Sequence, residues 1–245
     1  MAEKILVASG KGGVGKSTLA AFLGRELTLR GKKVLLVDTD VGLSALDLLL
    51  GVTERVVYNW QDVLKARCEP QDAVLIMDDK GLLSLLPAPL VFVNSLILPS
   101  EMKLLVAKYE PDYDYILIDA PAGLGPGVVM SSASADWAIV VATPDEVSVR
   151  GAFAVAEMLR AKGVRHARLV INRFRKKAVR QGSLLDYDSM IDKTGVRLIG
   201  IVPESADPSF AFALQIPLRA KNRALQAFRR IAARVDGENI PLGTL

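Results

Sequence analysis

The nine residues from Gly10 to Thr18 constrain this 245-residue chain more than any other segment. They have the sequence GKGGVGKST, which contains a glycine, four further residues, and then glycine, lysine and serine. A short apolar run, Lys4–Ala8, precedes them, and apolar residues recur at helical spacing from Leu19 to Leu29. The segment therefore predicts a strand, a tight glycine-rich turn and a helix, which together form the opening unit of an α/β fold.

This turn has the composition of a phosphate-binding loop. Glycines allow successive backbone N–H groups to point at phosphate oxygens, and the positive end of the following helix adds to the attraction. Lys16 is placed to reach the β- and γ-phosphates, and the Ser17 hydroxyl is placed to ligate Mg²⁺. We expect phosphate or nucleotide contacts from the whole loop, which comprises Gly10, Lys11, Gly12, Gly13, Val14, Gly15, Lys16, Ser17 and Thr18.

The loop carries one lysine more than the general pattern requires, at Lys11. In this it resembles the deviant Walker A loop, KGGVGKST, of the MinD/ParA family of P-loop ATPases. The resemblance implies ATP or ADP with Mg²⁺ as ligands, a slow and partner-stimulated ATP hydrolysis, and an ATP-dependent homodimer. Lys11 would cross the dimer interface to the partner's phosphates, as an arginine finger does, so Lys11 and Lys16 are both expected to be catalytic.

Two later apolar runs end in carboxylates. The run Lys33–Asp40 ends in Asp38 and Asp40, and the run Tyr113–Asp119 ends in Asp119. Carboxyl ends of parallel strands face the ligand, so these groups are predicted beside the loop. The family resemblance implies that Asp40 orients the attacking water. The resemblance also implies that Asp38 lies near the metal and that Asp119 holds Mg²⁺ through its water shell. Ser17 is the third expected metal-binding residue.

The same resemblance marks residues 38–47 and 119–127 as segments that rearrange when the γ-phosphate leaves, and we call them the first and second switch segments. Glycines at 123, 125 and 127 suit such movement. An activating or effector protein is expected to bind near these segments.

Two candidate adenine contacts lie at the ends of later strands. Asn172 ends the predicted strand Arg168–Arg173 and matches the adenine-contacting position of the family, and Pro203 lies in a segment that flanks the base in relatives. An asparagine amide has a donor and acceptors that can pair with the adenine edge. Without the resemblance, an asparagine at this place is typical of a turn.

Strand and helix patterns alternate along the chain, with a strand at Ala138–Ala142 and a helix near Val147–Arg160. A hydrophobic content of 51% suffices for a sheet covered on both faces, and no linker, repeat or low-complexity tract divides the chain. We predict one α/β domain over residues 1–235, with a doubly wound, mostly parallel sheet and helices on both faces. An irregular tail is predicted for residues 236–245.

Cys68 is the only cysteine, so neither an intramolecular disulfide nor a cysteine-ligated iron–sulfur site is predicted. The first strand leaves no room for a signal peptide, and no stretch is long and apolar enough to span a bilayer. The longest apolar region, Leu82–Leu98, is broken by prolines and an asparagine. A cytoplasmic protein is expected, which would reach a membrane only at its surface.

Within the family, the segments Asp40–Leu48, Arg55–Leu64 and Pro144–Arg150 are more similar to MinD than to plasmid-type ParA. This similarity favours an ATPase that acts in septum site placement during cell division. The last periodic segment, Lys221–Val235, is predicted to pack its Leu225, Phe228 and Ile231 stripe into the core. Glycine and proline interrupt the residues after it, so the amphipathic membrane anchor usual in MinD is not evident.

Alternatives remain open. Basic residues gather late in the chain and could neutralise the phosphates of non-specific DNA, as in ParA-type partitioning ATPases, or of anionic lipid. They are Arg165, His166, Arg168, Arg173, Arg175, Lys176, Lys177, Arg180, Arg219, Lys221 and Arg223. A flagellar-number regulator of the same family is a further possibility. A small-molecule ATP-dependent synthetase is disfavoured, because the sequence shows no added substrate domain.

Overall fold

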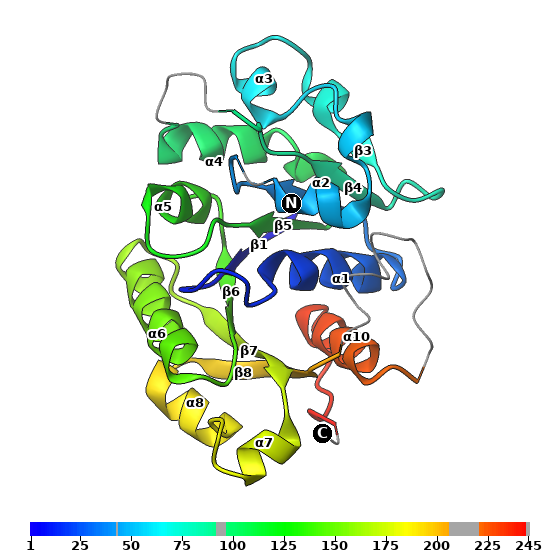
Figure 1. Ribbon diagram of the computed structural model, residues 1–245. Coiled ribbons are helices and arrows are strands. Elements are labelled where there is room, and N and C mark those ends of the chain that lie inside the picture. The colour runs from blue at the N-terminus through cyan, green and yellow to red at the C-terminus, as the bar shows by residue number, and fades with distance from the viewer. Residues whose placement is uncertain (43, 92–96, 206–220, 244–245) are drawn as a thin grey trace.

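The protein is built around one eight-stranded sheet (Figure 1). Our computed structural model describes residues 1–42, 44–91, 97–205 and 221–243. In chain order the strands are β1 (Glu3–Ala8), β2 (Val34–Asp38), β3 (Leu75–Ile76), β4 (Leu83–Leu86), β5 (Tyr115–Asp119), β6 (Trp137–Ala142), β7 (Ala167–Phe174) and β8 (Arg197–Pro203). Their spatial order is β3-β4-β2-β5-β1-β6-β7-β8.

All the strand pairs are parallel except β3 with β4, which is antiparallel. The centre of the sheet is β1, between β5 and β6. In register, Val7 faces Asp119 and Asp38 also faces Asp119, so the ends of β1, β2 and β5 lie level with one another. This alignment brings the glycine-rich loop after β1 to the same sheet edge as the aspartates, and we call it the carboxyl edge.

Helices cover both faces of the sheet (Figure 1). One face carries α1 (Lys16–Thr28), α2 (Ala45–Leu50) and α10 (Arg223–Val235), whose apolar side chains share one core. The other face carries α3 (Trp60–Leu64), α4 (Pro99–Ala107), α5 (Pro126–Ser132), α6 (Glu146–Ala161) and α8 (Tyr187–Thr194). The short α7 (Lys176–Arg180) and the 3₁₀ turns Thr53–Arg55, Pro70–Ala73 and Glu110–Asp112 complete the described elements. The predicted doubly wound sheet is confirmed.

Burial explains why the strand sequences lack polar alternation. Every residue of β2 and β5 is buried, as are the last four residues of β1. A parallel strand with helices on both faces has no solvent side, so it needs apolar side chains in both directions. The charged exceptions, Asp38 and Asp119, are the final residues of their strands.

The last helix, α10, belongs to the core as predicted. Leu225, Phe228 and Ile231 are buried, and the Phe228 ring stacks on Phe22 of α1 with 4.7 Å between ring centroids. The helix begins at Arg223 because the Asn222 side chain accepts a hydrogen bond from the Leu225 N–H at 3.1 Å. A lipid anchor is therefore the wrong interpretation of this stripe.

The segment that follows α10 is irregular over its described residues, 236–243. Arg234 fixes it through two hydrogen bonds from its guanidinium to the Ile240 carbonyl, at 3.0 and 3.1 Å. Asp236 accepts hydrogen bonds from Arg30, in the turn after α1, and from the Tyr115 hydroxyl. Residues 244–245 of the predicted tail lie outside the described part of the chain.

Two strand ends differ from the prediction. The strand predicted to reach Asp40 ends at Asp38, because the Asp38 carboxylate turns back to accept the Asp40 N–H at 2.9 Å. Asn172 does not end its strand: β7 continues to Phe174, through a register irregularity in which Arg173 has φ 54°. A side-chain hydrogen bond or a local bulge does not change the spacing of apolar residues, so the sequence pattern could not predict these two strand ends.

Candidate functional site

The loop between β1 and α1 has a backbone that glycine permits. Gly13 and Gly15 have φ of 75° and 95°, in the left-handed region, and Gly15 directly precedes α1. Gly10 touches the backbone of Gly151 in α6, because a Cβ on Gly10 would lie 2.3 Å from the Gly151 carbonyl carbon. The loop therefore packs against α6 and leads into the first turn of α1. The positive end of the α1 dipole faces the loop.

Asn172 is part of the support for this loop. Its Nδ2 donates a hydrogen bond to the Val14 carbonyl at 2.7 Å, and its Oδ1 accepts the Arg173 N–H at 2.9 Å. A Cβ on Gly15 would lie 2.3 Å from the same Nδ2. Asn172 thus reaches the phosphate loop itself, and its predicted contact with a base stays a prediction.

Pro203 lies farther along the same edge. It is half-buried at the end of β8, in register with Phe174, and the Glu204 N–H donates to the Phe174 carbonyl at 3.1 Å. None of the described hydrogen bonds links this segment to the loop. The base-flanking role of Pro203 likewise stays a prediction.

Asp38 is a fully buried carboxylate whose two oxygens both have partners. Oδ1 accepts the Asp40 N–H at 2.9 Å, and Oδ2 accepts the Leu46 N–H of α2 at 3.0 Å. Burial, and next the negative charge of Asp119, raise the pKa of Asp38 above its ordinary range, against the effect of these two hydrogen bonds. The carboxylate thereby organises the turn that carries Asp40.

Asp119 differs from Asp38 in having no hydrogen-bond partner. Both of its carboxylate oxygens are buried, and neither finds a donor among the described residues. Burial raises its pKa, whereas the Lys16 ammonium and the nearby Ser17 hydroxyl act in the opposite direction. The Ser17 hydroxyl approaches this carboxylate without completing a hydrogen bond. A buried carboxylate without a donor is costly, and it marks a place where a ligand completes the structure.

Asp40 completes the acidic group. It is half-buried, burial raises its pKa, and the positive charge of Lys16 opposes that effect. Lys16 itself is buried at the first position of α1. One cation therefore acts electrostatically on both Asp40 and Asp119, and the three predicted aspartates do gather around the loop.

These residues fit a magnesium ion. The unpartnered oxygens of Asp119, the neighbouring Ser17 hydroxyl and the Asp38 carboxylate supply hard oxygen donors, which Mg²⁺ prefers. No three His, Cys, Asp or Glu side chains within the described ranges form a metal-binding group. Mg²⁺ at this edge would therefore depend on waters and on phosphate oxygens as further ligands, as is usual for this ion with nucleotides.

Lys11 turns towards its own chain. Its Nζ lies 3.4 Å from Asp145 Oδ1, and the two side chains are 46% and 36% exposed. Asp145 also caps α6 by accepting the Ser148 N–H at 3.0 Å. Asp145 was not predicted as a partner of Lys11, although an aspartate directly before a helix is a capping signal.

A hollow of about 450 Å³ adjoins the outer side of the loop. Its size suits a small-molecule site. Arg175 lies on its wall and pairs with Glu204 at 3.3 Å. Its lining residues are Lys11, Gly12, Gly13, Val14, Thr143, Pro144, Asp145, Arg173, Arg175, Leu184 and Glu204.

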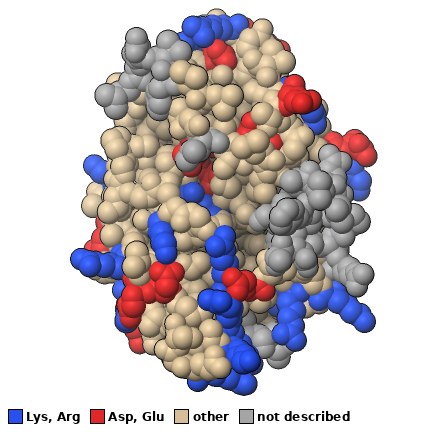
Figure 2. Space-filling model, in the orientation of Figure 1, with Lys and Arg blue, Asp and Glu red and all other residues tan. Residues whose placement is uncertain are grey.

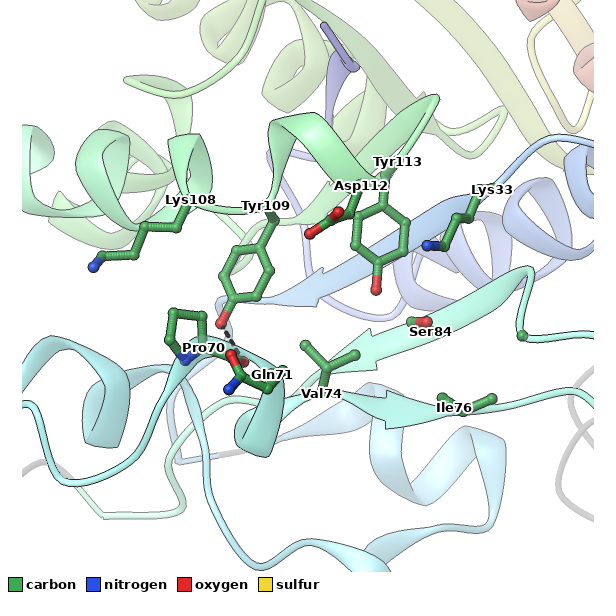
Figure 3. Close-up of a pocket in the computed structure, with 11 residues that line it drawn as sticks. Lys33, Pro70, Gln71, Val74, Ile76, Ser84, Lys108, Tyr109, Asp112 and Tyr113 are labelled. Atoms are coloured by element: carbon green, nitrogen blue, oxygen red, sulfur yellow. Dashed lines mark hydrogen bonds between the residues drawn. The ribbon is translucent and has the colours of Figure 1, made fainter.

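A second hollow, of about 360 Å³, lies at the opposite, amino edge of the sheet (Figure 3). Tyr109 and Tyr113 project into it side by side, and the Tyr109 hydroxyl donates to the Pro70 carbonyl at 3.0 Å. The Lys33 ammonium lies 5.2 Å from the centroid of the Tyr113 ring. None of the described residues that line this hollow belongs to a glycine-rich loop or is a buried aspartate, so it lacks the features of a nucleotide site.

Basic side chains gather on the lower half of the face in view, around α7 (Figure 2). Arg173, Arg175, Lys176, Lys177 and Arg180 are all exposed there. Arg219 and also Leu43 of the first switch segment lie outside the described residues. Among the described helices, none has both the length and the apolar character needed to cross a bilayer.

Comparisons with known proteins show the family of the chain. A family profile described as ParA, "NUBPL iron-transfer P-loop NTPase", matches residues 1–203. The septum site-determining protein MinD of Bacillus subtilis is 38% identical over 250 residues, which cover 100% of this chain and 93% of that protein.

Solved structures give the same result. The MinC:MinD cell division protein complex of Aquifex aeolicus contains a chain that is 36% identical, with a TM-score of 0.86 and 99% coverage of both chains. MinD of Pyrococcus horikoshii, solved with Mg-ADP, is 27% identical, with a TM-score of 0.84 and 97% coverage of both chains.

The sheet order, the glycine-rich loop after β1 and the aspartates that end β2 and β5 define a P-loop NTPase. The full-length matches narrow this class. The chain belongs to the ParA family of P-loop NTPases, on the branch of the MinD septum site-determining proteins.

Proposed function

We propose that this protein is an ATPase that binds ATP with Mg²⁺ at the carboxyl edge and acts as a nucleotide-controlled switch in septum site placement. The observation that carries the proposal is Asp119, a buried carboxylate without a donor that faces Lys16 and Ser17 of the loop. The relatives named MinD support the cellular role, and the Mg-ADP of the P. horikoshii protein supports the ligand.

The proposed roles follow the geometry. Backbone N–H groups of Gly10–Thr18 cradle the phosphates, and Lys16 neutralises the β/γ charge. Ser17, Asp38 and Asp119 hold Mg²⁺, directly or through water, and this ion supplies charge neutralisation on the phosphate oxygens. Asp40 is half-buried beside Lys16, where it orients the attacking water. Asn172 and Pro203 border the base.

Lys11 is proposed to act in trans. In the single chain it is held by Asp145, and the pair is exposed enough for water to compete for it. In an ATP-bound homodimer, Lys11 leaves Asp145 and contacts the partner's phosphates, where a cation is worth about 10³–10⁵ in rate in related chemistry. Dimerisation thereby switches on hydrolysis.

An activating or effector protein is proposed to bind at the switch segments, residues 38–47 and 119–127. The MinC:MinD complex of A. aeolicus supports a protein partner for this branch. The surface on which the dimer acts has two candidates. The exposed cations around α7 favour a polyanion, either an anionic membrane surface or, as the alternative function, non-specific DNA in a ParA-type role.

Sedimentation of the purified chain with Mg-ATP and with Mg-ADP tests the proposal. We expect a dimer with ATP and a monomer with ADP, no ATP dimer for Lys11→Ala, and a trapped ATP dimer for Asp40→Ala. Brisk ATP turnover by Asp40→Ala would remove its assigned role. Co-sedimentation with anionic liposomes and with non-specific DNA then separates the two surfaces.

A further inference from the structure

Two buried hydroxyls, those of Thr39 and Ser131, meet between the switch segments. Thr39 lies between Asp38 and Asp40, and Ser131 lies in α5, the helix that begins in the second switch segment. The two side-chain oxygens are 2.7 Å apart, and the two residues are 1% and 0% exposed. No water reaches this pair, so its hydrogen bonds must be made within the protein.

The pair makes more short contacts than it has hydrogens. Thr39 Oγ1 lies 2.7 Å from the Asp119 carbonyl oxygen, and Ser131 Oγ lies 2.8 Å from the Gly127 carbonyl oxygen. With the contact between the hydroxyls, three oxygen–oxygen contacts share two hydroxyl hydrogens, because carbonyls only accept. One contact must therefore lack a hydrogen at any moment.

Two hydrogen-bond arrangements place a hydrogen between the two hydroxyl oxygens, so that their lone pairs do not face each other. In one, Ser131 donates to Thr39 and Thr39 donates to the Asp119 carbonyl. In the other, Thr39 donates to Ser131 and Ser131 donates to the Gly127 carbonyl. The Asp119 carbonyl also accepts the Thr39 N–H at 3.0 Å, and the Gly127 carbonyl can accept from the next turn of α5, so neither carbonyl is abandoned. Each arrangement therefore leaves both carbonyls with a donor.

We propose that this hydroxyl pair couples the two switch segments, so that a displacement of α5 selects one arrangement and thereby repositions Asp38 and Asp40. This inference rests on the proposed ATPase function. A Cβ on Gly127 would lie 2.8 Å from Pro121 Cγ, so the start of α5 is packed directly on the loop after Asp119. Movement of that loop is transmitted to Ser131 through the helix and to Thr39 through the hydroxyls.

The chain contains its own reporter for this movement. Trp60 is fully buried, and its Nε1 donates to the Asp38 carbonyl at 2.9 Å. The second tryptophan, Trp137, donates instead to Glu3 at the amino edge, at 2.6 Å. In a Trp137→Phe background, tryptophan fluorescence therefore reports on the backbone beside Thr39.

The test compares Thr39→Val, Ser131→Ala and their combination in that background, with Ser132→Ala as matched control. Ser132 is also buried in α5, but its hydroxyl donates only to Val129 of the same helix, at 2.8 Å. We expect each single variant to reduce both the ATP-minus-ADP fluorescence change and the hydrolysis rate by about tenfold, and the double variant to lose no more than either. Thr39→Ser and Ser132→Ala should behave as the parent does.

ADP affinity checks that each variant folds, and it should stay within about twofold of the parent, since no hydroxyl of the pair touches the loop. Single variants that match the parent, or a double variant whose losses multiply to about a hundredfold, would overturn the coupling. A parent that binds no ATP would overturn the proposed function and this inference together. A parent that hydrolyses ATP while its variants show multiplying losses would remove the inference alone.

Discussion

The two edges of the sheet treat their acidic side chains in opposite ways. At the amino edge two carboxylates bind backbone N–H groups: Asp136 accepts the Lys4 N–H at 2.8 Å, and Asp114 accepts the Lys33 N–H at 2.7 Å. At the carboxyl edge, Asp119 has no donor among the described residues, and the charge of Asp119 itself disfavours ionisation of Asp38. The amino edge is complete as a folded structure, whereas the carboxyl edge leaves a buried carboxylate without a donor, which fits the proposed nucleotide site.

The same contrast holds for cations. Lys4 at the amino edge lies between two acids, Glu110 at 3.1 Å and Asp136 at 3.2 Å, and its side chain is 16% exposed. Lys11 at the carboxyl edge has one exposed partner at 3.4 Å. The ion pairs of the amino edge thus belong to the folded structure, and the proposed nucleotide site lies at the other end of the same strands, as expected for an open α/β sheet.

Gly15→Ala should be the most damaging of these changes. The backbone at Gly15 is left-handed, which disfavours any residue with a Cβ, and the added Cβ would also collide with Asn172. The free energy of unfolding should therefore fall by about 3 kcal/mol. Gly12→Ala is the matched control for stability, because nothing lies within 4 Å of the added Cβ and its φ is not positive. Urea unfolding compares the two. Equal losses would mean that the loop is not strained at Gly15.

Asp119→Asn should stabilise the protein without ligand. Burial raises the pKa of Asp119 in the folded state, so ionisation opposes folding as the pH rises above about 4, the ordinary value for aspartate. The variant should gain about 2 kcal/mol in unfolding free energy at pH 8 and little at pH 4.

The amino edge provides the control for this gain. Asp136→Asn should instead lose about 1 kcal/mol, because it weakens an ion pair and a hydrogen bond that are already made. Urea unfolding at both pH values measures the two variants. A loss of stability for Asp119→Asn at pH 8 would contradict the contrast between the edges.

Lys11→Ala should have the smallest effect on stability, below about 0.5 kcal/mol, because its ion pair is exposed. Lys4→Ala should cost about 1 kcal/mol, since that ammonium is largely shielded and bridges two acids. Thermal unfolding of both variants without nucleotide gives the comparison. A larger loss for Lys11→Ala would assign Lys11 a structural role.

Much of the site was predictable because its signals are local. The glycine-rich loop with Lys16 and Ser17 directly follows an apolar run, and the aspartates end apolar runs. Parallel pairing of the strands then aligns these strand ends at one edge of the sheet. The burial of Phe228 and Ile231 followed from helical periodicity in the same way.

Contacts between distant segments were not predictable. Lys11 and Asp145 are 134 positions apart, and Thr39 and Ser131 are 92 positions apart, so only the assembled sheet brings them together. The two-residue strand β3 was missed for another reason, since a run that short carries no period. The base-contacting role of Asn172 stays a prediction, and its hydrogen bond to Val14 was not predicted because that bond depends on how β7 lies beside the loop.

Calorimetric titration with Mg-ADP determines whether the nucleotide binds at the carboxyl edge. Lys16→Ala should weaken binding by about a hundredfold or more, because it removes the buried cation of the loop. Lys33→Ala, which changes the hollow at the amino edge, should leave the affinity unchanged. Full binding by Lys16→Ala, or a comparable loss in Lys33→Ala, would contradict the assignment of the nucleotide to the carboxyl edge.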